Sequence, residues 1–260
     1  MLQLKDIEFS YSNAKKERFS ILQGLNLTVP QGEVMALVGG NGVGKTTLFN
    51  IISGQQKDFR GKVIFEGHDI SRLPAHDVSL LGIGRLFQGR QLMDDLSLLD
   101  NFKIASFDKT GEFPFSYLFF SAKIKKAEQL KEAQTREIIA DVFGRDCKYI
   151  KMLEAKGGEF SYGEQRMLAI ARLLMGKNKL LLLDEPTSGV NPVYNKQFGR
   201  IIRQLVEEQG MTVLLIEHNM HFVRSVADSC AFLSDGKIAA IGRTEEVLND
   251  QFVRNSYLGL

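Results

Sequence analysis

A short glycine-rich segment, residues 39–47, constrains the fold of this chain more than any other feature. It reads Gly-Gly-Asn-Gly-Val-Gly-Lys-Thr-Thr and fits the phosphate-binding pattern G-x-x-x-x-G-K-[ST] from Gly39 to Thr46. The apolar run Val34–Val38 before it predicts a buried strand, and Thr46–Ile52 after it predicts a helix. Strand, glycine loop and helix in this order bring backbone N–H groups together around a phosphate. The alternative is a chance glycine-rich turn, and the flanking strand and helix argue against it.

The residue types within this loop suit a bound triphosphate. Gly42 and Gly44 let the backbone curl because they lack a Cβ. Lys45 is expected to place its ammonium group between the β- and γ-phosphates, and Thr46 to offer a hydroxyl to Mg²⁺. The predicted nucleotide-binding residues of the loop are Gly39, Gly40, Asn41, Gly42, Val43, Gly44, Lys45, Thr46 and Thr47.

Composition narrows the class of protein. Of 260 residues, 44% are hydrophobic and 25% are charged, as in an ordinary soluble globular protein. No apolar stretch approaches the roughly 18 to 20 uncharged residues that span a bilayer, and Met1–Asp6 lacks the features of a signal peptide. A formal net charge of +2 gives no support for a nucleic-acid partner. Cys147 and Cys230 lie far apart without neighbouring ligands, which predicts free thiols and fits a reducing cytosol.

The order of predicted elements indicates an α/β core interrupted by a helical subdomain. The first part carries four strand candidates, separated by turns at 30–32 and 60–61: Leu2–Phe9, Leu25–Val29, Val34–Val38 and Lys62–Phe65. Residues 97–175 are mainly helical in pattern, including Ala122–Phe143. The last part alternates strands and helices, with predicted elements at Leu180–Leu183, Val193–Gln209, Thr212–Ile216, Ala231–Ser234 and Lys237–Ile241.

Two adjacent acids follow the predicted strand Leu180–Leu183. Open α/β sheets bind ligands at their strand ends, so Asp184 and Glu185 lie where a Walker-B pair would. Asp184 is the predicted Mg²⁺ ligand, directly or through water, and Glu185 is the predicted general base for the attacking water. Two solvated acids in a turn are the alternative, which the upstream phosphate loop disfavours. Together the two motifs indicate a nucleoside triphosphatase.

Residues 160–166, Phe-Ser-Tyr-Gly-Glu-Gln-Arg, precede a helix predicted at Met167–Met175 and resemble the LSGGQ signature of ATP-binding cassette (ABC) ATPases. Ser161 and Gly163 match directly. Ser161 and the amides after it would cap a helix and form an anion site, although a plain N-cap without a ligand has the same pattern. The order of motifs along the chain is that of ABC ATPases: phosphate loop, Gln88, signature, Asp184-Glu185 and His218. Three signature positions depart from the family pattern: Phe160, Tyr162 and Glu164.

The resemblance covers essentially the whole chain and implies further roles. Tyr11, which follows the first predicted strand, would stack on adenine, unless it is an ordinary strand aromatic. Gln88 would reach Mg²⁺ and the attacking water, and His218 would contact the γ-phosphate. Asn191 stands where most members have Asp in the D-loop, which makes the usual contact across the dimer less certain, although an amide can still bond there. Three histidines match no family position and are expected on the surface: His68, His76 and His221.

The family implies a P-loop NTPase core, with a mixed or parallel sheet, flanking helices and an antiparallel β subdomain, interrupted by an α-helical subdomain. The expected division is 1–88 with 179–260 for the core and 89–178 for the signature subdomain. ATP and Mg²⁺ are the implied cofactors. The implied catalytic residues are Lys45, Gln88, Glu185 and His218, the implied metal ligands are Thr46, Gln88 and Asp184, and the implied signature contacts are Ser161, Gly163, Glu164 and Gln165.

The family also implies partners and a location. Two chains, identical or paralogous, would dock head-to-tail with two ATP molecules in the seam. Integral-membrane permease subunits would hold them at the inner, cytoplasmic face of the cell membrane. Several runs resemble the ATPases of branched-chain amino-acid importers: Ser-Tyr-Gly-Glu-Gln-Arg, Ser-Gly-Val-Asn-Pro, Glu-His-Asn-Met and Tyr257-Leu258-Gly259. The alternatives are urea uptake, a lipopolysaccharide-type exporter and a soluble, non-transport ABC ATPase.

Two further segments keep two interpretations each. The aromatic run 113–120 either packs inside the helical subdomain or docks a membrane subunit. Residues 123–128, Lys-Ile-Lys-Lys-Ala-Glu, form either a solvated helix face or a lipid-headgroup contact.

Overall fold

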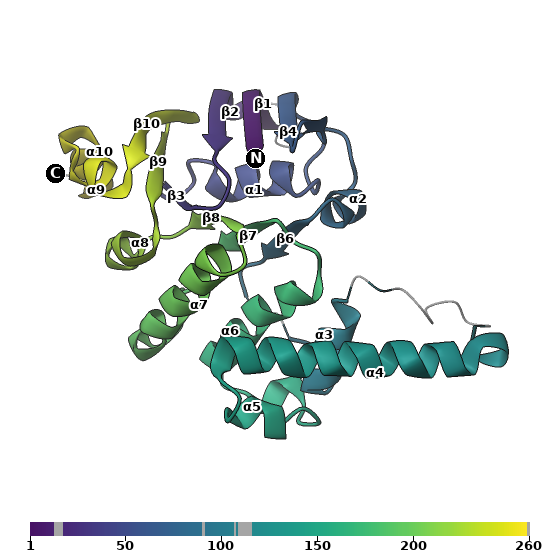
Figure 1. Ribbon diagram of the computed structural model, residues 1–260. Coiled ribbons are helices and arrows are strands. Elements are labelled where there is room, and N and C mark those ends of the chain that lie inside the picture. The colour runs from purple at the N-terminus through teal and green to yellow at the C-terminus, as the bar shows by residue number, and fades with distance from the viewer. Residues whose placement is uncertain (13–17, 90–91, 107, 109–115, 259–260) are drawn as a thin grey trace. The chain divides into compact units, whose positions relative to one another are not determined.

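The computed structural model describes residues 1–12, 18–89, 92–106, 108 and 116–258. The chain divides into two compact units, one formed by Met1–Arg85 with Lys179–Leu260 and the other by Leu86–Asn178. The first unit carries the sheets and the second is mainly helical (Figure 1). The expected fold class, an α/β core interrupted by helices, is confirmed.

A six-stranded sheet forms the centre of the first unit, in the order β10-β9-β3-β8-β7-β6. Strand β3 runs parallel to β8 and β9, β7 runs parallel to β8, and β10 closes the edge antiparallel to β9. Every residue of β3, β7 and β8 is buried, as expected for parallel strands covered on both faces. The strands are β3 (Val34–Val38), β6 (Ile83–Leu86), β7 (Leu180–Asp184), β8 (Thr212–Ile216), β9 (Ser229–Ser234) and β10 (Lys237–Arg243).

A second, antiparallel sheet has the order β2-β1-β4-β5. Its strands are β1 (Leu2–Ser12), β2 (Arg18–Val29), β4 (Arg60–Phe65) and β5 (His68–Asp69). The predicted turn at Arg60-Gly61 is wrong, because both residues belong to β4. Gly61 has φ +99° and packs against the backbone of Asp6, where the pairing of β1 with β4 shifts register. This bulge needs the glycine that sequence reasoning took for a turn.

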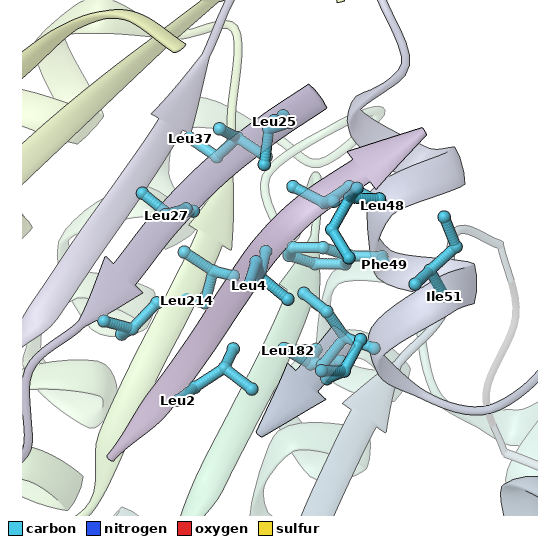
Figure 2. Close-up of a cluster of buried hydrophobic side chains, with 14 of the residues drawn as sticks. Leu2, Leu4, Leu25, Leu27, Leu37, Leu48, Phe49, Ile51, Leu182 and Leu214 are labelled. Carbon is cyan, nitrogen blue, oxygen red and sulfur yellow. The ribbon is translucent and has the colours of Figure 1, made fainter. Parts of the chain in front are cut away.

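The hydrophobic core of the first unit lies between the two sheets and helix α1 (Lys45–Ile52) (Figure 2). Strand residues alternate between faces, so Leu37 of β3 faces this core while Ala36 and Val38 belong to a second cluster. Three helices contribute to the second cluster: α8 (Met220–Val226) with Val223, α9 (Thr244–Asn249) with Val247 and α10 (Gln251–Leu258) with Val253. The labelled side chains of the first cluster are Leu2, Leu4, Leu25, Leu27, Leu37, Leu48, Phe49, Ile51, Leu182 and Leu214.

The remaining helices of the first unit are short except α7. The predicted helix Val193–Gln209 is present as a 3₁₀ turn at Pro192–Tyr194 followed by α7 (Asn195–Glu207), whose buried face includes Phe198, Ile201 and Leu205. Cys147 and Cys230 are free, as predicted. The other helices are α2 (Ala75–Leu80), α8 (Met220–Val226), α9 (Thr244–Asn249) and α10 (Gln251–Leu258).

The second unit is built around the long helix α4 (Ser116–Phe143), which contains the predicted helix Ala122–Phe143. Buried residues recur along it at helical spacing: Ile124, Ala127, Lys131, Thr135 and Ile139. Residues 113–115 of the aromatic run lie outside the described residues, and the side chains of 116–120 are likewise not described. The other helical segments are α3 (Leu98–Ile104), α5 (Lys148–Lys151), the 3₁₀ turns Gly157–Glu159 and Leu173–Met175, and α6 (Tyr162–Arg172).

Candidate functional site

The glycine loop connects β3 to α1, as its sequence context predicts. Gly42 and Gly44 both have positive φ, of +77° and +108°. Gly44 is the N-cap of α1 in the left-handed conformation, and no side chain caps the helix there. The N-cap therefore offers no side-chain acceptor to the amides of the first turn, so this end of α1 suits a phosphate.

Lys45 folds back over the loop that precedes it. Its Nζ donates to the carbonyl oxygens of Gly39 at 2.8 Å and Gly40 at 2.7 Å. Only 6% of the residue is exposed. Desolvation by burial lowers the pKa of Lys45, and the negative charges of Glu185 and Asp184 oppose that shift. The loop lysine and the two predicted acids thus share one electrostatic environment.

Asp184, the last residue of β7, is 2% exposed. Its Oδ2 lies 3.3 Å from Nη2 of Arg85, and both side chains of this ion pair are almost fully buried. Burial lowers the pKa of the Arg85 guanidinium, and Asp184 opposes that shift. A guanidinium stays charged under such a shift, so Asp184 has a permanent positive partner.

Glu185 and His218 meet across two neighbouring strands. Nε2 of His218 lies 3.0 Å from Oε1 of Glu185, and the Glu185 amide donates to the carbonyl of Ile216 at 2.9 Å. Glu185 has φ +47°, in the left-handed region that a residue with a Cβ seldom adopts. Such a conformation costs of order 1–3 kcal/mol, and it occurs at the residue whose carboxylate contacts the imidazole.

Glu217 is a buried carboxylate, 2% exposed, that joins the loops after β7 and β8. Its Oε1 accepts hydrogen bonds from the amide and the hydroxyl of Thr187, at 2.8 and 2.6 Å. Its Oε2 accepts from the amide of His218 at 3.0 Å. Glu217 therefore fixes the backbone next to both Glu185 and His218.

Tyr11 lies within β1, not after the first strand as predicted, because β1 continues to Ser12. The residue is 50% exposed, and its ring packs edge-on against Phe9, with centroids 4.7 Å apart. Tyr11 pairs with Phe19, two residues along β2 from Ile21, whose side chain abuts Gly44. An exposed aromatic ring on the strand pair that adjoins the glycine loop is compatible with stacking on a base.

In the second unit, Ser161 is the N-cap of α6 in a reciprocal capping box with Glu164. The Ser161 hydroxyl accepts from the Glu164 amide, and Oε2 of Glu164 accepts from the Ser161 amide at 2.8 Å. Helix α6 therefore begins at Tyr162, five residues before the predicted Met167. The capping box stabilises this additional turn, which sequence reasoning took for part of a loop.

The signature glutamate is also paired. Desolvation pushes the pKa of Glu164 upward, but hydrogen bonds from Lys148 and Ser161 outweigh it and hold the pKa below its usual value. Gly163 is buried, and Nε2 of Gln165 donates to the carbonyls of Gly157 and Phe160, so this amide holds the loop that leads into α6. Of the four predicted signature contacts, Ser161, Gly163, Glu164 and Gln165, only Ser161 is exposed.

Gln88 lies in the same unit as the signature helix. Arg166 of α6 is 1% exposed, and its Nη1 donates to the carbonyls of Phe87 at 3.2 Å and Gly89 at 2.9 Å. These two carbonyls flank Gln88. One guanidinium from the signature helix thus fixes the backbone on both sides of the predicted Q-loop glutamine.

Sequence reasoning missed three functional candidates: Arg85, Glu217 and Arg166. Each is a charged residue buried beside a motif residue that was identified. The only signal in the sequence was adjacency, since Arg85 precedes Gln88 by three positions, and Glu217 and Arg166 adjoin His218 and Gln165. The expected surface positions of His68, His76 and His221 are confirmed, because all three are exposed.

The described residues contain no group of three or more His, Cys, Asp or Glu side chains that could hold a metal ion by itself. Mg²⁺ commonly takes one or two carboxylates together with substrate phosphates and water. Asp184 beside an uncapped phosphate-loop helix fits this donor set. Within the same described residues, no helix combines the length and apolar character needed to cross a membrane.

These features define an ATP-binding cassette. The ABC transporter family model matches residues 22–188, and the chain belongs to that family and is an ABC-type ATP hydrolase. It is 30% identical to the high-affinity branched-chain amino acid transport ATP-binding protein BraF of Pseudomonas aeruginosa, over 92% of this chain and 91% of that protein. It is 34% identical to the probable branched-chain amino acid transport ATP-binding protein LivG of Archaeoglobus fulgidus, over 92% and 89%.

Solved structures agree with this assignment. A nucleotide-free ATP-binding cassette from an ABC transporter matches with a TM-score of 0.80 and 30% identity, over 100% of this chain and 99% of that one. The ADP conformation of a cassette from an ABC transporter matches with the same values. The predicted family and P-loop NTPase fold are confirmed, and the chain is an ATP-binding subunit of an ABC transporter.

Proposed function

We propose that this chain binds and hydrolyses ATP with Mg²⁺ to power the uptake of branched-chain amino acids or a related polar solute. The observation that carries the catalytic part is the grouping of Lys45, Asp184, Glu185 and His218 around the glycine loop and the ends of β7 and β8. The solute rests on the names of the relatives, which are branched-chain amino acid transport ATP-binding proteins.

Within one copy of the chain, different residues bind the nucleotide, bind the metal ion and activate the attacking water. Lys45 and the amides of the loop hold the β- and γ-phosphates, and Tyr11 stacks on the base. Thr46, Gln88 and Asp184 would hold Mg²⁺, and the ion would neutralise charge on the phosphates. Glu185 takes a proton from the attacking water, and His218, 3.0 Å away, orients that carboxylate and contacts the γ-phosphate.

A second copy, or a paralogous subunit, completes the site. Ser161 and the exposed amino end of α6 from that copy contact the γ-phosphate held by Lys45, so two ATP molecules are bound in the seam. Residues 1–88 and 179–260 act as the ATPase core and 89–178 as the signature subdomain. The subdomain passes the loss of the γ-phosphate to integral-membrane permease subunits at the inner face of the cell membrane.

A phosphate-release assay tests the catalytic part. We expect Glu185→Gln to retain ATP binding, to lose nearly all turnover and to accumulate as a dimer in light scattering. Lys45→Ala should weaken ATP binding. His218→Ala should lower turnover, whereas the exposed His221→Ala serves as the matched control and should not. Hydrolysis by Glu185→Gln at close to the wild-type rate would remove Glu185 from the role of base.

The solute requires the complete transporter. With the permease subunits reconstituted in proteoliposomes, we expect ATP-dependent accumulation of labelled leucine, isoleucine or valine, and Glu185→Gln should abolish it. Accumulation of labelled urea instead would assign the related polar-solute branch. ATP hydrolysis without movement of any of these solutes would reject the import proposal while leaving the ATPase assignment intact.

A further inference from the structure

We propose that Arg85 is a positioning residue for Asp184: it holds the carboxylate at the end of β7 in place and ties it to the last turn of α1, so that the carboxylate is set for Mg²⁺. This inference rests on the proposed metal-binding role of Asp184. Arg85 belongs to none of the motifs that identified the family, and the structure brings it to the site from β6.

The first part of the argument is the ion pair itself. Nη2 of Arg85 lies 3.3 Å from Oδ2 of Asp184, with side chains 5% and 3% exposed. Asp184 follows four fully buried leucines, so its carboxylate has an apolar strand behind it. A buried carboxylate in such a position requires a partner charge, and Arg85 supplies it.

The second part is the anchoring of Arg85. Its Nη1 donates to Oδ1 of Asn50 at 2.8 Å and to Oγ of Ser53 at 2.9 Å. Ser53 in turn donates to the carbonyl of Phe49 at 2.8 Å, and the Arg85 guanidinium lies 5.7 Å from the Phe49 ring centroid. The guanidinium therefore has a fixed orientation before any metal arrives.

Charge explains why a cation occupies this position. The carboxyl end of a helix carries partial negative charge, and α1 has no basic residue of its own in its last turn. Arg85, which lies in strand β6, places a cation at this end of α1. Because the amino end of α1 carries Lys45 and Thr46, one helix joins the phosphate loop to the group that holds Asp184.

Only a planar fork can serve both sides. Arginine presents five donors in a rigid arrangement, so one nitrogen reaches Asp184 while the other reaches Asn50 and Ser53. Lysine carries the same charge on a single nitrogen and cannot make both sets of contacts at once. Arg85→Lys therefore keeps the positive charge beside Asp184 but removes the set of hydrogen bonds that orients the side chain.

Equilibrium binding of a methylanthraniloyl ATP analogue, titrated with Mg²⁺ and repeated in EDTA, tests the inference. We compare wild type, Arg85→Lys, Arg85→Gln and Asp184→Asn, with Arg203→Gln as control because Arg203 pairs with Asp228 away from the site. We expect both Arg85 variants to raise the Mg²⁺ concentration for half-maximal binding by about tenfold or more, with analogue affinity in EDTA unchanged. Arg203→Gln should bind like wild type.

Each other outcome decides the matter. If the Arg85 variants unfold at lower temperature but keep the wild-type Mg²⁺ midpoint, Arg85 is purely structural and the inference fails. A lower midpoint would mean that Arg85 competes with Mg²⁺, which also overturns it. If Asp184→Asn leaves the midpoint unchanged, the proposed metal role of Asp184 fails first. Should Arg85→Gln not fold, Arg85→Lys still gives the decisive midpoint.

Discussion

The hydroxyl of Thr187 donates a 2.6 Å hydrogen bond to the buried carboxylate of Glu217. Thr187 follows Glu185 by two residues, and Glu217 immediately precedes His218. The bond therefore joins the two loops that carry the Glu185–His218 pair, whose side chains lie 3.0 Å apart. Loop backbone is ordinarily mobile, and a buried charge-assisted bond of this kind is what holds such a pair in register.

Thr187→Val removes this hydroxyl while keeping the shape of the side chain. A hydrogen bond to a buried charged group contributes about 1.5–3 kcal/mol, so we expect a loss of that order in urea unfolding. Turnover should fall while ATP affinity stays near wild type, because the phosphate loop is untouched. Ser188→Ala, an exposed neighbour, is the control. Unchanged turnover in Thr187→Val would show that the bond does not orient Glu185 and His218.

Two loop glycines should differ sharply when replaced by alanine. A Cβ on Gly39 would overlap the carbonyl oxygen of Leu233 in β9, whereas a Cβ on Gly42 meets nothing within 4 Å. Gly42→Ala should cost about 1–2 kcal/mol through its positive φ alone. Gly39→Ala should cost at least about 3 kcal/mol because backbone must move. Equal costs in urea unfolding of nucleotide-free protein would contradict the close approach of the loop to β9.

The buried thiol of Cys230 should make the free energy of unfolding fall at alkaline pH. Burial raises the pKa of its thiol from 9.0 to about 12, so the folded state keeps the proton at pH values where the unfolded state releases it. Its contribution to stability is complete below pH 9.0 and is lost as the pH rises toward 12, by about 1.4 kcal/mol per pH unit.

Cys230→Ala should remove this slope. The measurement is the free energy of unfolding in urea at several alkaline pH values, taken as the difference between variant and wild type because lysines and tyrosines titrate in both. A constant difference across this range would contradict the burial argument. In native protein, a thiol reagent should modify the half-buried Cys147 and leave Cys230 until denaturant is added.

Alanine substitutions of two N-cap serines in the second unit distinguish an effect on stability from an effect on ATP hydrolysis. Ser161 caps α6 and Ser97 caps α3 in the same way, each accepting from the amide three residues on. Either change to alanine should cost about 1 kcal/mol. Only Ser161→Ala should also lower ATP hydrolysis, because only that helix end is proposed to contact the γ-phosphate. Equal loss of hydrolysis in both variants would make Ser161 a structural cap alone.

The local pattern of apolar and polar residues predicted the helices and strands that carry the site, but it did not predict where each of them begins and ends. The helix before Met175 was predicted at Met167 but begins at Tyr162, because a capping box adds a turn whose side chains resemble loop residues. The turn predicted at Arg60-Gly61 is part of β4, where Gly61 lies opposite a bulge in β1. A glycine with positive φ has the same appearance in the sequence at a turn and at a bulge. Tyr11 was placed beyond β1 because the strand extends further along β2 than its apolar alternation indicates.

The sequence by itself determined the family, the α/β class and the position of the phosphate loop. Each motif consists of residues close together in the chain, and the order of the motifs can be read directly from it. The tertiary structure alone decided that Arg85 pairs with Asp184, 99 positions away, that Glu217 holds Thr187, and that Arg166 holds the carbonyls around Gln88. Burial makes these contacts necessary, since a charged group removed from water needs a partner. Which partner it finds depends on strand order and helix packing, and no local periodicity records those.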